Sequence, residues 1–159
     1  MQTSQRNPID QALLHAAQST DFNLAGPAAV ALVNHHNNQW TDDMVNRLHS
    51  IKDPLDKIRM AQTLALAGRY EGWDIIKSSI ANKQPYMTYS VEAAWAVPDF
   101  VGMKDQTGKP VDLVSELGLL HSVAQPEVQQ AIRLAIIALG PPPPGGSKSN
   151  TPHRYTTMD

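Results

Sequence analysis

The chain has 159 residues, a length that fits one domain with a hydrophobic core of its own. Its formal net charge of -2 excludes the surplus of Lys and Arg by which nucleic-acid-binding proteins contact phosphates, so no nucleic-acid partner is expected. It contains no cysteine, which excludes disulfides, thiolate metal ligands and a cysteine nucleophile.

The same sequence predicts a cytoplasmic location. The lack of cysteine fits a reducing compartment. The amino-terminal residues are polar where a signal peptide would be apolar, and no stretch approaches the roughly 18 apolar residues of a membrane span. We therefore expect neither secretion nor membrane insertion.

The first two helices are predicted from prolines at helical starts. Pro8, preceded by Asn7 as N-cap, begins a helix that is expected to end near Ser19. After a polar loop, Pro27 is expected to begin a second helix, which ends in a cluster of polar residues before Trp40.

The third helix is predicted to begin at Thr41, because threonine before an apolar helical pattern suits an N-cap. Asp42 and Asp43 follow at the positive end of the helix dipole, where carboxylates are stabilising. This helix is expected to end at Lys52 and Asp53.

The middle of the chain predicts an αα-hairpin. Asp53 and Pro54 begin a helix that ends at Gly68, which is expected to form a left-handed C-terminal cap. A second helix follows at once, from about Tyr70 to Ala81. The short connection implies that the two helices pack against each other.

Three further helices complete the predicted fold. Pro85 begins one that is expected to break at Pro98, because a proline ring removes a donor and crowds the preceding turn. A polar connector leads to a helix around 111–122. Pro126 begins the last helix, which is expected to end at Gly140.

The helices that begin at prolines share a register. Their anchors Ile58, Val91 and Val128 lie 33 and 37 residues apart. Small residues at fixed places allow close helix approach in a stack of repeats. Each anchor is followed three places later by alanine and ten to twelve places later by glycine: Ala61, Ala94 and Ala131, then Gly68, Gly102 and Gly140.

This pattern resembles the HEAT-repeat family, especially its short bacterial repeats of the phycobilisome-lyase type. The resemblance covers roughly 53–140 and is carried by DPLDKIRMAQTLALAGRYEGWDIIKSSIAN, QPEVQQAIRLAIIALG and, more loosely, QPYMTYSVEAAWAVPDFVG. Pro98 departs from the pattern, which has alanine there. The resemblance implies an all-α fold, a right-handed α-α superhelix forming a HEAT-like solenoid of about seven or eight helices over 1–140.

After Gly140 the composition changes to PPPPGGSKSNTPHRYTTMD, which has no apolar periodicity. The sequence predicts a disordered, proline-rich tail over 141–159. Its four consecutive prolines are expected to hold a short polyproline II segment.

The sequence predicts no metal or other cofactor. Among six histidines, the adjacent His35 and His36 would point about 100° apart on a helix, and no HExxH or i, i+4 histidine pair occurs. Walker, GxSxG and GxGxxG patterns are also absent. We therefore expect a non-catalytic protein.

The alternative is an enzyme of the HEAT-like type, such as a DNA glycosylase that holds alkylated bases with Trp and Asp on a basic surface. Trp73, Asp74, Trp95 and Asp99 supply those residue types. The basic surface is missing from an acidic chain, and Trp95, which lies between two alanines, is predicted to be a core residue.

The predicted function is a protein-protein interaction module. The resemblance implies that the second helix of each pair lines a concave face, and acidic side chains outnumber basic ones there, which favours a basic protein as partner. Adaptor, chaperone-like subunit and inhibitor or immunity protein remain open, as does the oligomeric state. The candidate partner-binding residues are Asp42, Asp43, Arg47, Trp73, Asp74, Lys77, Asp112 and Glu116.

Overall fold

A computed structural model describes residues 8–19, 21–35 and 38–140, and these residues are all-helical, as predicted. Asn7 and the predicted tail over 141–159 lie outside the described residues. No helix within the described ranges has the length and apolar character needed to cross a membrane. The helices are α1 (Pro8–Ala17), α2 (Phe22–Asn34), α3 (Asn38–Arg47), α4 (Pro54–Leu66), α5 (Trp73–Ala81), α6 (Met87–Ala96), α7 (Leu113–His121) and α8 (Pro126–Leu139), with 3-10 helices η1 (Leu48–Ser50) and η2 (Val97–Phe100).

The chain divides into two compact units within α5, between Ile75 and Ile76. Unit 1 contains α1 to α4, and unit 2 contains α6, η2, α7 and α8. The sequence prediction of one helical domain over 1–140 stays a prediction.

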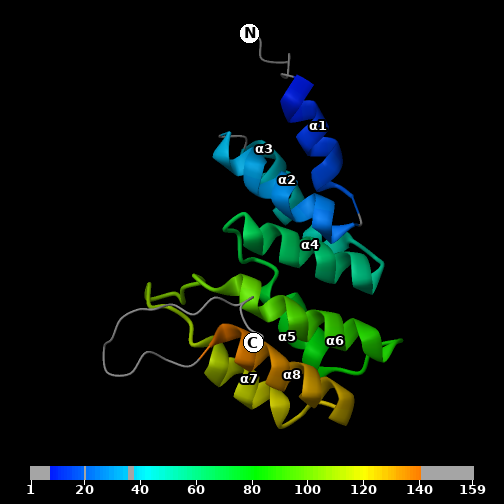
Figure 1. The fold of residues 1–159 in the computed structure, drawn as a ribbon, viewed down its shortest axis with the longest axis vertical. Helices are drawn as coiled ribbons and strands as arrows, with labels where there is room; N and C mark the ends of the chain where they lie inside the picture. The colour runs from blue at the N-terminus through cyan, green and yellow to red at the C-terminus, as the bar shows by residue number, and fades with distance from the viewer. Residues whose placement is uncertain (1–7, 20, 36–37, 141–159) are drawn as a thin grey trace, which may run out of the picture. The chain divides into compact units, whose positions relative to one another are not determined.

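In unit 1, α2 packs between α1 and α4, and α3 contacts both α2 and α4 (Figure 1). The facing surface of α2 is built largely from alanine, including the fully buried Ala29, so that neighbouring helices approach closely. Ile58 and Leu64 of α4 are at most 1% exposed, and Trp40 of α3 is 3% exposed. These side chains form the core of unit 1.

Two predicted helix starts in unit 1 are wrong. Helix α2 begins at Phe22, because the side chain of Asp21 accepts a hydrogen bond from the Asn23 N–H at 3.0 Å; Pro27 lies inside the helix and faces solvent. Helix α3 begins three residues before Thr41, whose buried hydroxyl donates to the Asn38 carbonyl at 2.7 Å. A threonine hydroxyl that bonds back to the preceding turn belongs to a helix interior.

The predicted ends of α4 are confirmed. The Asp53 carboxylate caps the helix by accepting from the Asp56 N–H at 2.9 Å, and Pro54 takes the first helical position. Gly68 has φ 83°, and the Arg69 N–H donates to the Leu64 carbonyl at 2.8 Å. This is the hydrogen bond of a Schellman cap, and it fixes the backbone of Arg69 directly after the helix.

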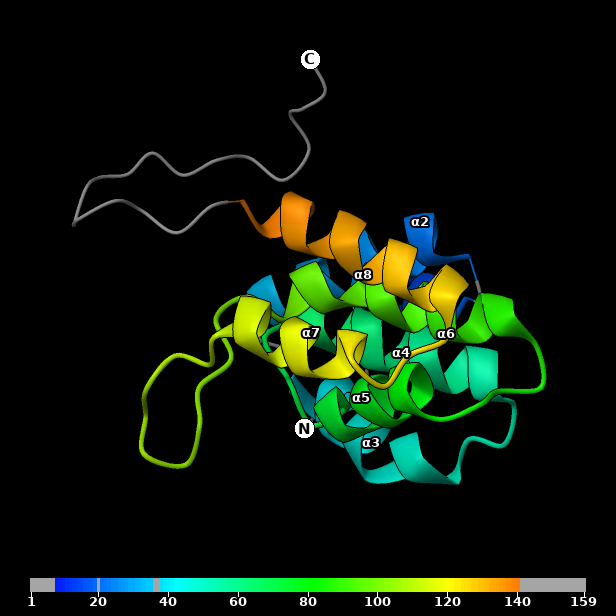
Figure 2. The ribbon, with the colours of Figure 1, turned by 90° about the horizontal axis from the view of Figure 1, so that it is seen from below.

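In unit 2, α6 packs along α8, and α7 packs against α8 and η2 (Figure 2). The break predicted at Pro98 is the 3-10 helix η2, whose Phe100 is fully buried. Residues 101–112 project from the helices in both ribbon views, and the isolated bridge between Lys104 and Pro110 closes this loop.

The small residues of the predicted register are buried or have the backbone conformation of a helix end, whereas the repeat itself stays a prediction. Ala61, Ala94 and Ala131 are at most 3% exposed, and Gly68, Gly102 and Gly140 all have positive φ. Two of the three anchors, Ile58 and Val128, are 1% exposed, whereas Val91 is half-buried.

Trp95 is not a core residue, contrary to the sequence prediction. Its side chain is 53% exposed, whereas Ala93, Ala94 and Ala96 around it are fully buried. Successive residues of a helix point about 100° apart, so the alanines occupy the packed side of α6 and leave the indole on the outer side.

Candidate functional site

The candidate partner-binding residues fall in both units. Unit 1 holds the five that come from α3 and the beginning of α5, namely Asp42, Asp43, Arg47, Trp73 and Asp74. Unit 2 holds Lys77, Asp112 and Glu116.

In unit 1, Arg69 joins two carboxylates that are far apart in sequence. Its Nη1 donates to Asp42 Oδ1 at 2.6 Å, and its Nη2 donates to Glu71 Oε2 at 2.7 Å. Its Nε also donates to both oxygens of Glu71, at 3.3 Å and 3.2 Å. This fork holds α3 and the turn before α5 in one charged network.

The hydrogen bonds of this network shift the pKa values of Arg69 and Glu71 in the directions that favour the charged form of each side chain. The hydrogen bond from Arg69 lowers the pKa of the Glu71 carboxyl, and the hydrogen bonds to Glu71 and then Asp42 raise the pKa of the Arg69 guanidinium. Asp42 and Glu71 nevertheless keep 62% and 44% of their side-chain surface exposed. The carboxylates are thus fixed in place and still accessible to a partner.

A second hydrogen-bonded pair of side chains lies in unit 1. His49 Nε2 is 3.0 Å from Asp74 Oδ2, and the two side chains are 59% and 67% exposed. Close to this pair, Gly72 packs against Leu48 of η1, since a Cβ built on Gly72 would lie 3.2 Å from Leu48 Cδ2. This close approach brings η1 next to the first turn of α5.

We call Asp42, Asp43, Glu71 and Asp74 the acidic cluster. Asp43 is exposed beside Asp42 on α3, and Arg47 is exposed one turn later, whereas Trp73 is half-buried. Arg69 and His49 were not among the predicted site residues. The sequence signal for Arg69 is its position directly after Gly68, where the cap conformation fixes the side chain's direction.

We expect Arg69→Met to lower the free energy of unfolding of unit 1 at pH 7, and this loss to disappear as the pH falls. Because Arg69 lowers the pKa of Glu71 from 4.5, the ion pair stabilises the fold above pH 4.5 and loses its effect as pH falls through the folded pKa. The side chains are largely exposed, so the loss is about 1 kcal/mol or less. Urea unfolding at pH 7 and at about pH 3 measures it.

Arg47→Met is the matched control for this experiment, because Arg47 also lies on unit 1 and is exposed. It should change stability little at either pH. An Arg69→Met loss that is equal at both pH values would mean that the arginine acts through packing of its aliphatic stem, not through its charge.

In unit 2, the three predicted residues have structural partners. Lys77 Nζ lies 3.9 Å from Glu116 Oε1. Asp112 caps α7 by accepting from the backbone N–H of Ser115 at 3.1 Å and from its hydroxyl at 2.8 Å, which lowers the pKa of the Asp112 carboxyl. The main role of Asp112 is therefore to cap the start of α7.

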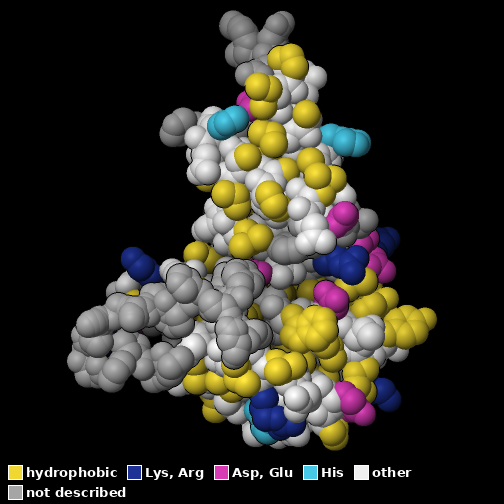
Figure 3. Space-filling model, in the orientation of Figure 1, with side chains coloured by type: hydrophobic (Ala, Val, Ile, Leu, Met, Phe, Trp, Pro, Cys, Tyr) yellow, Lys and Arg dark blue, Asp and Glu magenta, His cyan; other side chains and the backbone are white. Residues whose placement is uncertain are grey.

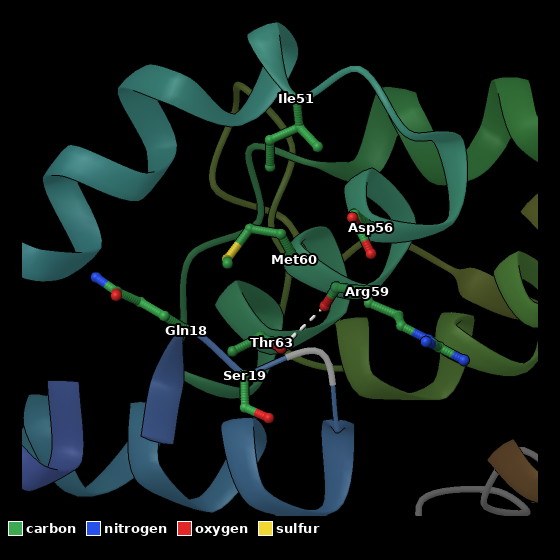
Figure 4. Close-up of a pocket in the computed structure, with 7 residues that line it drawn as sticks. All are labelled: Gln18, Ser19, Ile51, Asp56, Arg59, Met60 and Thr63. Carbon is green, nitrogen blue, oxygen red and sulfur yellow. Dashed lines mark hydrogen bonds between the residues drawn. The ribbon is translucent and has the colours of Figure 1, made fainter. Parts of the chain in front are cut away.

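A hollow of about 240 Å³ lies in unit 1 between the end of α1, Ile51 and α4 (Figure 4). Its polar groups do not converge on one point. The Arg59 guanidinium extends away from Ile51 and Met60, and the Thr63 hydroxyl donates to the Arg59 carbonyl at 2.9 Å. The hollow therefore offers no set of groups directed at one ligand.

The residues of the enzyme alternative are also divided between the units. Trp73 and Asp74 belong to unit 1, where Asp74 is paired with His49, and Trp95 and Asp99 belong to unit 2. Within the described ranges no group of three or more His, Asp or Glu side chains is arranged to hold a metal ion. Comparisons of the chain with protein-family models, curated proteins and solved structures find no match.

Proposed function

We propose that this chain is a non-catalytic protein-interaction module whose helix pairs stack as HEAT-like repeats. The packing within each unit supports this proposal. In unit 1 the first helices α2 and α4 are neighbours and α3 contacts both, and in unit 2 the first helices α6 and α8 are neighbours and α7 contacts α8. Repeats that stack in this way present the side chains of their second helices as a continuous surface.

The acidic cluster is the observation that carries the proposal. Its four carboxylates come from the second helix α3, from the turn before the next second helix, α5, and from the first turn of α5. Arg69 orders two of them, and ordered groups lose less conformational entropy when a partner binds. Arg47 and Arg69 compensate the four carboxylates only in part, so the surface favours a partner with Lys and Arg at its contact.

The partner's charge follows from this chemistry, and its biological role does not. An adaptor, a chaperone-like subunit and an inhibitor or immunity protein against a basic toxin all fit an acidic surface on a helical module. The proposal therefore commits to a basic protein partner, bound through unit 1.

We expect the double substitution Asp43→Lys/Asp74→Lys to weaken binding of a basic partner at least about ten-fold, because each reversal replaces an attraction with a repulsion. The partner is first captured with the full chain and identified. Its dissociation constant is then measured by titration calorimetry at low and high salt. Binding through the acidic cluster should weaken as salt rises, since exposed charges are screened.

The matched control is Glu92→Lys/Glu127→Lys, which changes the net charge equally on the first helices α6 and α8. This control should retain most of the affinity. Equal losses in both variants would show that only net charge matters, and unchanged binding in the acidic-cluster variant would place the contact elsewhere. Far-UV circular dichroism confirms that each variant remains helical.

A further inference from the structure

In unit 2, the end of α7 contacts α8 through a histidine and an arginine. Arg133 Nη1 lies 3.0 Å from His121 Nε2. Figure 3 shows a histidine beside Lys or Arg side chains at the lower end of the view, where Figure 1 places α7 and α8. Arg133 is exposed and His121 is half-buried, so both groups can be reached from solvent.

Two glutamines of α8 hold this pair in place. Gln130 Oε1 accepts from Arg133 Nε at 3.2 Å and from Arg133 Nη2 at 2.7 Å. Gln129 Nε2 donates to the His121 carbonyl at 2.9 Å, which ties the end of α7 to α8. Among the described residues no carboxylate forms an ion pair with Arg133. A neutral side chain thus orders the guanidinium and leaves its charge uncompensated.

The contact with Arg133 determines the protonation state of His121. A guanidinium has N–H donors and no acceptor, so Nε2 must accept the hydrogen bond, and the ring is neutral with its proton on Nδ1. A proton added at Nε2 would break this hydrogen bond and place a second positive charge beside the guanidinium. An anion that accepts from both groups would offset the repulsion between them.

The other charged side chains around the histidine leave these two positive charges uncompensated. The elements packed against α7 are α8 and η2. Glu127 of α8 lies six residues before the arginine and therefore points about 120° away from it. Glu116 of α7 has its Oε1 3.9 Å from Lys77 Nζ, and Asp99 of η2 forms no ion pair with the histidine.

We propose that His121 and Arg133 form a pH-dependent site for a doubly charged oxyanion such as phosphate or sulfate. Nη1 of Arg133 is not bonded to Gln130, so it can donate to the anion once the histidine is protonated. Histidine changes its charge near about pH 6.5, so the site has both positive charges below neutral pH and loses one above it. This inference is independent of the proposed function, because the acidic cluster lies in unit 1.

NMR titration of the full chain with sulfate tests the proposal, because sulfate stays doubly charged while histidine titrates. Amide resonances at the end of α7 and in the middle of α8 should shift saturably. The dissociation constant should be about five-fold lower or more at about pH 5.5 than at about pH 8, the factor that one unit charge at roughly 4 Å contributes in water. Sodium chloride at matched ionic strength is the reference, since any salt screens exposed charges.

Three variants separate the two side chains from net charge. Arg133→Met should abolish saturable sulfate binding at both pH values, because it removes the donors and retains the aliphatic stem. His121→Gln should retain weak binding through Arg133 and lose the difference between the two pH values. Lys104→Met is the matched control, because it removes one exposed positive charge elsewhere in unit 2, and it should bind sulfate like the unchanged chain.

Shifts equal to those in sodium chloride would overturn the proposal. So would saturable sulfate binding by Arg133→Met, or a pH difference that persists in His121→Gln. An equal loss in Lys104→Met would assign the effect to the net charge of unit 2 instead. Arg133→Lys keeps the charge without the planar fork and should bind sulfate more weakly than the unchanged chain. Far-UV circular dichroism establishes that each variant retains its helices.

Discussion

Replacing Gly72 with alanine should lower the free energy of unfolding of unit 1 by about 3 kcal/mol or more. A Cβ at this position would lie 2.4 Å from Ala61 Cβ and 3.0 Å from Ala61 Cα. Real Cβ atoms essentially never come within 3.0 Å of such an atom, and the second contact, which is with backbone, lies at that limit. Helix α4 would therefore have to move away from the turn before α5.

Gly68→Ala is the matched comparison, because Gly68 lies in the same unit and a Cβ there meets nothing within 4 Å. Its φ of 83° makes alanine strained, at a cost of about 1 to 2 kcal/mol. Urea unfolding should thus rank Gly72→Ala as clearly less stable than Gly68→Ala. Equal losses would mean that backbone conformation, not the contact with Ala61, decides the effect.

We also expect Gly72→Ala to change the acidic cluster. Gly72 allows the turn before α5 to pack on Leu48, close to the pair in which His49 lies 3.0 Å from Asp74. An alanine that displaces the turn should weaken binding of a basic partner even where the protein remains folded. The salt dependence of binding at a temperature well below the unfolding midpoint measures this effect.

Phe100→Ala should lower the free energy of unfolding of unit 2 by about 3 to 5 kcal/mol. Phe100 is fully buried and is the largest side chain of the core with less than 2% exposure. Truncation removes its apolar surface from the core and leaves a cavity that the short helix η2 cannot fill by moving. The loss would be a large part of the stability of a small unit.

Phe100→Leu retains most of the buried volume and should be much less destabilising, by about 1 to 2 kcal/mol. Trp95 fluorescence reports unfolding of unit 2, and Trp40, which is 3% exposed, reports unfolding of unit 1. A Phe100→Ala protein as stable as the Phe100→Leu protein would contradict a rigid core around η2.

Helix ends were predictable from sequence wherever one residue determines the local conformation. Asp53 and Pro54 begin α4, and Gly68 ends it, because capping and left-handed backbone depend on the residue itself. Pro27 misled the prediction for the opposite reason. Its ring fits a helix start, but the cap supplied by Asp21 begins α2 earlier and leaves the proline inside.

The spacing of apolar and small residues also predicted which side of most helices is buried. Ala61, Ala94 and Ala131 are in the core because helices that stack closely need small residues at the contact. The spacing did not determine whether the Trp95 side chain is buried or exposed. Its neighbours on both sides are buried alanines, and which side of α6 meets α8 depends on the packing of unit 2.

Some features of the candidate site were predictable from the sequence, and others were not. The sequence identified Asp42, Asp43 and Asp74 as acidic residues and placed all three at helix starts, which is right for Asp74 and wrong for Asp42 and Asp43, because α3 already begins at Asn38. The contacts of Arg69 with Asp42 and of His49 with Asp74 join residues 27 and 25 positions apart. Such pairs depend on how helices are placed in space, which no short window of sequence contains.

The sequence by itself thus determined an all-helical chain, most helix ends and the positions of the small residues that let helices pack closely. These features follow from backbone conformation and from periodicity within one or two turns. Only the tertiary structure decided that Arg69 orders two carboxylates of the acidic cluster, that Gly72 is sterically required and that Trp95 faces outward. Each of these depends on contacts between segments distant in sequence, whose geometry is set by packing of the whole unit.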